Sequence, residues 1–169
     1  VLHYKFSIEL NDINDSIQGI AEIKVKFLQP AEELLLDLKS PAENGKGMRT
    51  GKVIGPYVKR ILQLYETITI QFSKTFNTGD TATFTIPYSG IPSDGLIISK
   101  NKYGHRTFFA DNWPNRAHNW IPCVDDPADK ATVEFIVTAP SHYQVISNGL
   151  QVEETDLPGN KKLTHYKED

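Results

Sequence analysis

Asp-Asn-Trp-Pro-Asn-Arg-Ala-His-Asn-Trp-Ile-Pro-Cys-Val-Asp-Asp-Pro-Ala-Asp-Lys-Ala fills positions 111–131, and Thr-Val-Glu-Phe-Ile-Val-Thr-Ala-Pro follows directly at 132–140. The first part holds both tryptophans, the only cysteine and a cluster of aspartates. In the second part Val133, Phe135 and Val137 alternate with mostly polar residues. A period of two is typical of a half-buried strand. The stretch therefore predicts an aromatic, acidic loop that leads into a strand.

The same alternation recurs along the chain, with turn residues between the runs. It predicts a first strand at 3–10 and a second, antiparallel to it, at 17–27. Further strands are predicted at 34–38, 48–54, 59–64, 67–72, 82–88, 96–98 and 131–138. Another is predicted at 143–147, ended by the hairpin dipeptide Asn148-Gly149, whereas the polar tail after Glu153 is expected to carry little core. No helical stripe persists over three turns, so the fold class is all-β, as a sandwich or barrel-like sheet pair.

Length and composition favour one ordinary globular domain. The chain has 169 residues and a net charge of -3, with Lys and Arg in no excess, so the sequence gives no reason to expect nucleic acid. No run approaches the roughly 18 apolar residues that span a bilayer, and no membrane partner is expected. The sequence starts at Val1 without an initiator Met, so we expect a segment of a longer protein. The single cysteine excludes an internal disulfide and a multi-cysteine zinc site.

Candidate catalytic and metal-binding residues are few. None of the five histidines is followed by Glu, so the helical two-histidine zinc motif is absent. His118, Cys123 and the aspartates 125 and 126 have no spacing that fixes a tetrahedral site, and no metal is expected in this segment. Cys123 is expected to be a small buried side chain. The aspartates at 125, 126 and 129 are expected to accept backbone N–H bonds in a turn, with Arg116 or Lys130 as further partners.

One motif resembles a known family. The run Pro122-Cys123-x-Asp125-x-Pro127-x-x-Lys130-Ala131, followed by an alternating strand and by Val-Ile-Ser-Asn-Gly at 145–149, is similar to the N-terminal domain of aminopeptidase N-type zinc metallopeptidases. Upstream, the opening strand and the Gly19-x-Ala21-x-Ile23-x-Val25 strand match that domain's layout. The resemblance implies a saddle-shaped antiparallel β-sandwich of many short strands.

The resemblance also implies what the chain does and does not do. Residues 1–169 would be a single, non-catalytic N-terminal β domain of a longer zinc aminopeptidase, a hydrolase that removes N-terminal residues from peptides. Its partners would be its own catalytic domain, which holds the zinc, and the N-terminus of the peptide substrate. The catalytic motif is not in this sequence, so the segment alone is not expected to cleave peptides. Export of the parent protein stays open.

The candidate substrate-binding residues follow from the same resemblance. In the family, a Gln or Glu ahead of the Pro-Cys motif helps to hold the free α-amino group of the substrate. Counting back from Pro122-Cys123, that position falls at Trp113, and Asp111 lies two residues earlier. Our hypothesis is that Asp111 supplies the negative charge while Trp113 forms a wall of the first substrate pocket. The alternative is that Asp111 only caps the turn at 112–114.

Two other functions remain open from the sequence. The chain could be a free-standing β-sandwich module that binds carbohydrate or protein through Trp113, Trp120 and Tyr103. It could also belong to a peptidase homologue that has lost zinc and serves as a scaffold. A His-Glu-x-x-His motif downstream in the parent protein would favour the peptidase over both.

Overall fold

The computed structural model describes residues 1–168. Within them the chain forms twelve strands and one short 3-10 helix, so the all-β prediction is confirmed. The elements are β1 (His3–Glu9), β2 (Ile17–Lys26), β3 (Ala31–Asp37), β4 (Gly47–Thr50), β5 (Val58–Leu64), β6 (Thr67–Phe76), β7 (Thr81–Ile91), β8 (Leu96–Lys100), β9 (Arg106–Ala110), η1 (Ala117–Asn119), β10 (Thr132–Pro140), β11 (Leu150–Leu157) and β12 (Lys161–Glu168).

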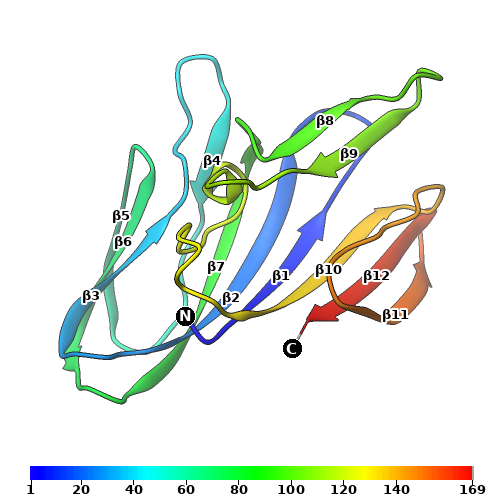
Figure 1. The fold of residues 1–169 in the computed structure, drawn as a ribbon. Helices are drawn as coiled ribbons and strands as arrows, with labels where there is room; N and C mark the ends of the chain where they lie inside the picture. Colours follow the sequence, from blue (N-terminus) through cyan, green and yellow to red (C-terminus); the bar gives the residue numbers. More distant parts are fainter. Residues whose placement is uncertain (169) are drawn as a thin grey trace.

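The strands form three sheets (Figure 1). A seven-stranded sheet has the order β11-β12-β10-β1-β2-β7-β4, a three-stranded sheet has the order β3-β6-β5, and β8 and β9 form a separate hairpin. The predicted antiparallel pairing of the first two strands is confirmed. The antiparallel β-sandwich is also confirmed, with one parallel pair among the named strands, since β1 and β10 run parallel with Phe6 opposite Phe135. Two parallel neighbouring strands need a long connection between them. Here the segment from β2 to the Pro-Cys loop connects β1 to β10.

The core lies where the inner faces of the two larger sheets meet. On β2 every second residue is buried, and on β7 the same holds from Ala82 to Tyr88, as the alternation predicts. Four phenylalanines join the sheets: Phe84 of β7 stacks on Phe72 of β6 with ring centroids 5.5 Å apart, and Phe76 stacks on Phe27 at 4.3 Å. Aromatic rings bury the largest area per side chain, so this cluster is a main source of packing energy.

The C-terminal part of the chain differs in part from its prediction. Residues 143–147 form no strand, and the Val145 carbonyl instead accepts a hydrogen bond from the Tyr166 hydroxyl at 3.3 Å. Asn148-Gly149 therefore does not close a hairpin; it leads into β11, which pairs with β12. Among residues 1–168 the polar tail carries little core, as expected: no residue of β11 or β12 belongs to the hydrophobic core cluster, although β12 pairs with β10 and Thr164 is fully buried.

Candidate functional site

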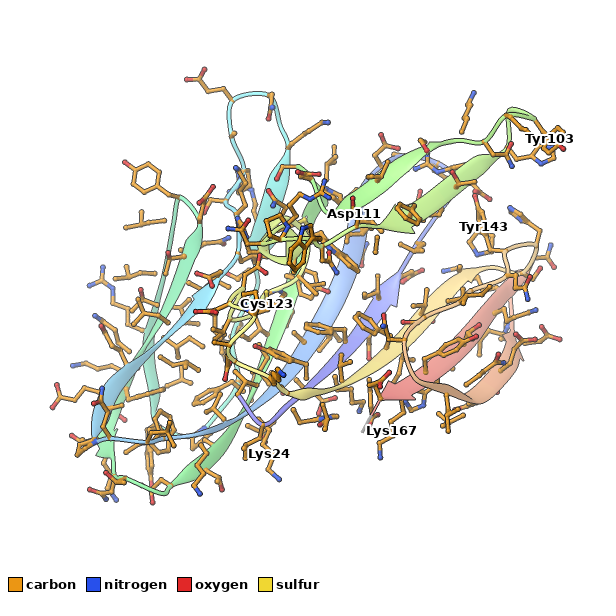
Figure 2. The ribbon with its side chains drawn as sticks, viewed as in Figure 1. Lys24, Tyr103, Asp111, Cys123, Tyr143 and Lys167 are labelled. Carbon is orange, nitrogen blue, oxygen red and sulfur yellow. The ribbon has the colours of Figure 1, made fainter. Side chains whose placement is uncertain are left out.

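The loop between β9 and β10 has a buried half and an exposed half. Trp120 and Cys123 are 5% and 6% exposed, whereas Trp113 is 76% exposed. Tyr103 lies at the tip of the β8–β9 hairpin, and Asp111 lies at its opposite end, next to the loop (Figure 2). Because Trp120 is buried, Trp113, Trp120 and Tyr103 cannot act together as one exposed aromatic face.

Backbone hydrogen bonds tie the buried half to the neighbouring strands. Cys123 exchanges two of them with Asp37 at the end of β3, with N···O distances of 2.6 and 3.1 Å. The Asp37 carboxylate accepts the N–H of Asp125 at 2.9 Å, and the Tyr4 hydroxyl of β1 accepts the N–H of Val124 at 2.9 Å. The Pro-Cys motif is thus anchored to both larger sheets, and it fixes where the exposed half begins.

Cys123 is a free thiol inside this anchored region. Burial raises the pKa of the thiol strongly, and the nearby Asp125 and Asp37 carboxylates raise it further. The thiolate is the form that binds metal or attacks an electrophile, so this protonated side chain suits neither task. The expectation that Cys123 is a buried side chain is confirmed.

Two of the aspartates that follow the cysteine accept hydrogen bonds from within the loop, whereas Asp129 pairs with the Val1 amino group at 2.8 Å. Asp125 accepts the backbone N–H of His118 at 3.1 Å and lies 2.6 Å from its ring Nδ1. Asp126 accepts the N–H of Ala128 at 2.9 Å, as a turn residue should. The last motif residues, Pro127 and Lys130, lie exposed on the turn that enters β10.

The exposed half carries a charged cluster that the sequence did not reveal. The Arg116 guanidinium pairs with the Asp111 carboxylate, lies 3.6 Å from Asp94, and donates to the Trp113 carbonyl at 2.8 Å. Within residues 1–168, no backbone N–H of the turn at 112–114 bonds to the Asp111 side chain, so that carboxylate does not cap the turn. The expected pairing of Arg116 with the aspartates near 125–129 is wrong, because its guanidinium faces Asp111 and Asp94.

Gly95 holds the hairpin against this loop. Its carbonyl accepts the N–H of Asp111 at 2.7 Å, and its φ is +73°. A Cβ at this position would lie 2.3 Å from the Arg116 carbonyl oxygen and 2.8 Å from Trp120 Cδ1. In the sequence, Gly95 ends a run of turn-forming residues, Ser93-Asp94-Gly95. This run does not indicate that the Pro-Cys loop packs on the glycine.

We expect Gly95→Ala to lower the free energy of unfolding by more than about 2 kcal/mol, since a left-handed backbone alone costs roughly 1–2 kcal/mol for an L-residue and the clash adds to it. Denaturant unfolding of the 169-residue chain measures the loss. Gly159→Ala is the control, because Gly159 has a φ of +79° but nothing within 4 Å of a new Cβ. Equal losses in the two variants would show that the loop does not pack on Gly95.

The described residues offer no metal centre. Within residues 1–168, no three His, Cys, Asp or Glu side chains come together as a metal-binding group. In this part of the chain His118 and Cys123 therefore lack a set of partner side chains, whereas a zinc site needs at least three protein ligands. The same residues include no helix of the length and hydropathy that a membrane crossing requires.

Comparisons with known proteins agree over the whole chain. A family model described as the peptidase M1 N-terminal domain matches residues 1–169. Two probable M1 family aminopeptidases of Encephalitozoon cuniculi, numbered 1 and 2, are 23% and 22% identical over 174 residues. These matches cover 98% of this chain but only 19% of each relative, so the chain spans about a fifth of their length.

Solved structures share the fold. An M1 zinc metallopeptidase from Deinococcus radiodurans has a TM-score of 0.82 at 22% identity, over 100% of this chain and 38% of that chain. A mutant of the Deinococcus radiodurans metallopeptidase bound to a Tyr-Ser-Ala substrate has a TM-score of 0.79 at 23% identity, over 99% of this chain and 38% of that chain. In both comparisons the similar region is a minority of the longer protein.

Proposed function

The chain belongs to the peptidase M1 N-terminal domain family, and from that premise we propose that it is the non-catalytic N-terminal domain of a zinc aminopeptidase. In this role it borders the substrate-entry side of an active site whose zinc lies in another domain of the same polypeptide. There the metal would activate the water that cleaves the peptide bond. The observation that carries the proposal is the family match over the whole chain.

The exposed half of the Pro-Cys loop is the part we assign to the substrate. An ammonium group that leaves water needs a counter-charge or fixed acceptors. The Asp111 side chain is 39% exposed, and its Oδ2 bonds to Arg116. Among residues 1–168, no donor forms a hydrogen bond with its Oδ1. Trp113 presents a wide apolar surface beside it. We assign amine binding to Asp111 and the wall of the first side-chain pocket to Trp113.

The remaining motif residues have a supporting role in the proposal. Cys123 and Asp125 anchor the loop to β3 by hydrogen bonds, and Pro122 is fully buried, while Pro127 and Lys130 lie exposed on the turn into β10. The catalytic domain of the same chain and a peptide with a free N-terminus are the partners proposed for this surface.

The test uses the full-length parent protein. We expect it to contain His-Glu-x-x-His downstream, to release N-terminal residues from short peptides, and to lose at least about 99% of that activity after chelation, because the metal generates the nucleophile. Residues 1–169 alone are expected to release none. A parent sequence without the motif, or activity that resists full removal of zinc, would contradict the proposal.

A further inference from the structure

Two carboxylates share one guanidinium at the exposed half of the loop. Arg116 Nη2 pairs with Asp111 Oδ2, and Arg116 Nη1 lies 3.6 Å from Asp94 Oδ1. An arginine keeps its positive charge at any physiological pH. The formal charge of the three side chains is therefore one negative unit, not zero. All three side chains are partly open to solvent: the exposed fraction is 47% for Asp94, 39% for Asp111 and 30% for Arg116.

The backbone holds these three residues in one frame. The Asp94 carboxylate accepts the N–H of Gly95 at 2.8 Å, and the Gly95 carbonyl accepts the N–H of Asp111 at 2.7 Å. Arg116 approaches the same glycine from the other side, since its carbonyl oxygen would lie 2.3 Å from a Cβ on Gly95. Asp94 therefore has a fixed place next to the Asp111–Arg116 pair, although it comes from a different segment of the chain.

Arg116 is itself fixed from within the loop. Its Nε donates to the Trp113 carbonyl at 2.8 Å, and its own carbonyl accepts the side-chain amide of Asn119 at 3.1 Å. Asn119 is buried and also accepts the Ser93 hydroxyl at 2.7 Å. Turning the guanidinium away from the carboxylates would break its Nε bond to Trp113, so in this arrangement it offsets one of the two negative charges.

We propose that Asp94 is a specificity-determining residue for the substrate amine. If Asp111 stood alone with Arg116, the pair would be neutral and would attract an ammonium group only weakly. Asp94 leaves one uncompensated negative charge at this place, which favours a peptide with a free, protonated N-terminus. The inference rests on the proposed function, and it adds a residue that lies outside the Pro-Cys loop.

Kinetics of the full-length enzyme test this role. Asp94→Asn keeps an oxygen for the Gly95 N–H and removes the charge. For a unit charge at roughly 6–8 Å in a half-exposed site, we expect KM for free-amine peptides to rise about threefold to tenfold, with kcat changed less than about twofold. The rise should shrink in high salt, because exposed charges are screened. The separate variant Asp94→Glu keeps the charge, so its KM should lie within about twofold of the wild-type value.

The control and the alternatives separate this inference from the proposed function. Asp156→Asn makes the same change on exposed edge strand β11 and should leave KM unaltered. If Asp111→Asn raises KM and Asp94→Asn does not, the role of Asp94 is wrong and the proposed function stands. If neither variant changes KM, the amine-binding role of the loop fails as well. If Asp94→Asn does not fold, the salt dependence of the wild-type KM still tests the inference. A wild-type KM that does not rise with salt contradicts it.

Discussion

Replacing Phe84 with Ala is expected to lower the free energy of unfolding by about 3–5 kcal/mol, the range found when a fully buried phenylalanine is truncated. Phe84 is 0% exposed on β7, and its ring lies 5.5 Å from Phe72 and 6.4 Å from Phe76 on β6. The ring also contacts Gly55, where a Cβ would come within 2.4 Å of it. Truncation leaves a cavity between two sheets, which cannot close without moving one of them.

Denaturant unfolding of the 169-residue chain measures this loss. Phe109→Ala is the matched control, because Phe109 is 62% exposed on β9 and its truncation should change stability by less than about 0.5 kcal/mol. The Phe84 variant should also bind a hydrophobic dye at lower denaturant concentrations. A loss below about 1 kcal/mol for Phe84→Ala would mean that the sheets do not pack through this phenylalanine cluster.

The predicted strands were found where one face of the strand is buried. Alternating apolar residues identified β1, β2, β6, β7 and β10, because each has a core face and an outer face. The parallel pairing of β1 with β10 had no signal in the sequence. Period-two alternation shows which residues face the core, but it does not show which strand lies alongside.

The strands that were missed lack that contrast between faces. Every residue of β11 except Leu157 is exposed, since β11 is the edge strand of the seven-stranded sheet, so its sequence shows no buried face. The reverse error occurred at 143–147, where an apolar run has strand-like residues but its backbone pairs with no neighbouring strand. β9 was missed because the polar turn before it and Arg106 broke the alternation.

The candidate site was predictable only in part. The Pro-Cys motif predicted the loop, and the family resemblance that it carries predicted Asp111 and Trp113 as site residues. Which half of the loop is buried depends on its bonds to Asp37 and Tyr4, far away in the sequence. For the same reason Asp94 was missed and Arg116 was given the wrong partners: a charged residue in a turn is ordinary, and only the folded chain brings the two together.

The second large effect is expected at Asp111. On the proposed function, Asp111→Ala in the full-length parent protein should raise KM and lower kcat for free-amine peptides, with kcat/KM falling roughly tenfold to a hundredfold, equivalent to about 1.4–2.7 kcal/mol. Removing this carboxylate leaves Arg116 with Asp94 at 3.6 Å, so the side chains lose their net negative charge and attract the incoming ammonium only weakly. Both binding and alignment of the substrate then suffer.

Whether the Asp111 and Trp113 half of the loop borders a substrate cavity is tested most directly by kcat/KM of the full-length Asp111→Ala enzyme on short peptides. The matched variant Asp156→Ala, on exposed edge strand β11, controls for loss of one negative charge elsewhere. We expect a fall of at least about tenfold for Asp111→Ala and none for Asp156→Ala, with unchanged thermal unfolding in both. Wild-type kcat and KM in the correctly folded Asp111→Ala enzyme would contradict the assignment of this loop to the substrate.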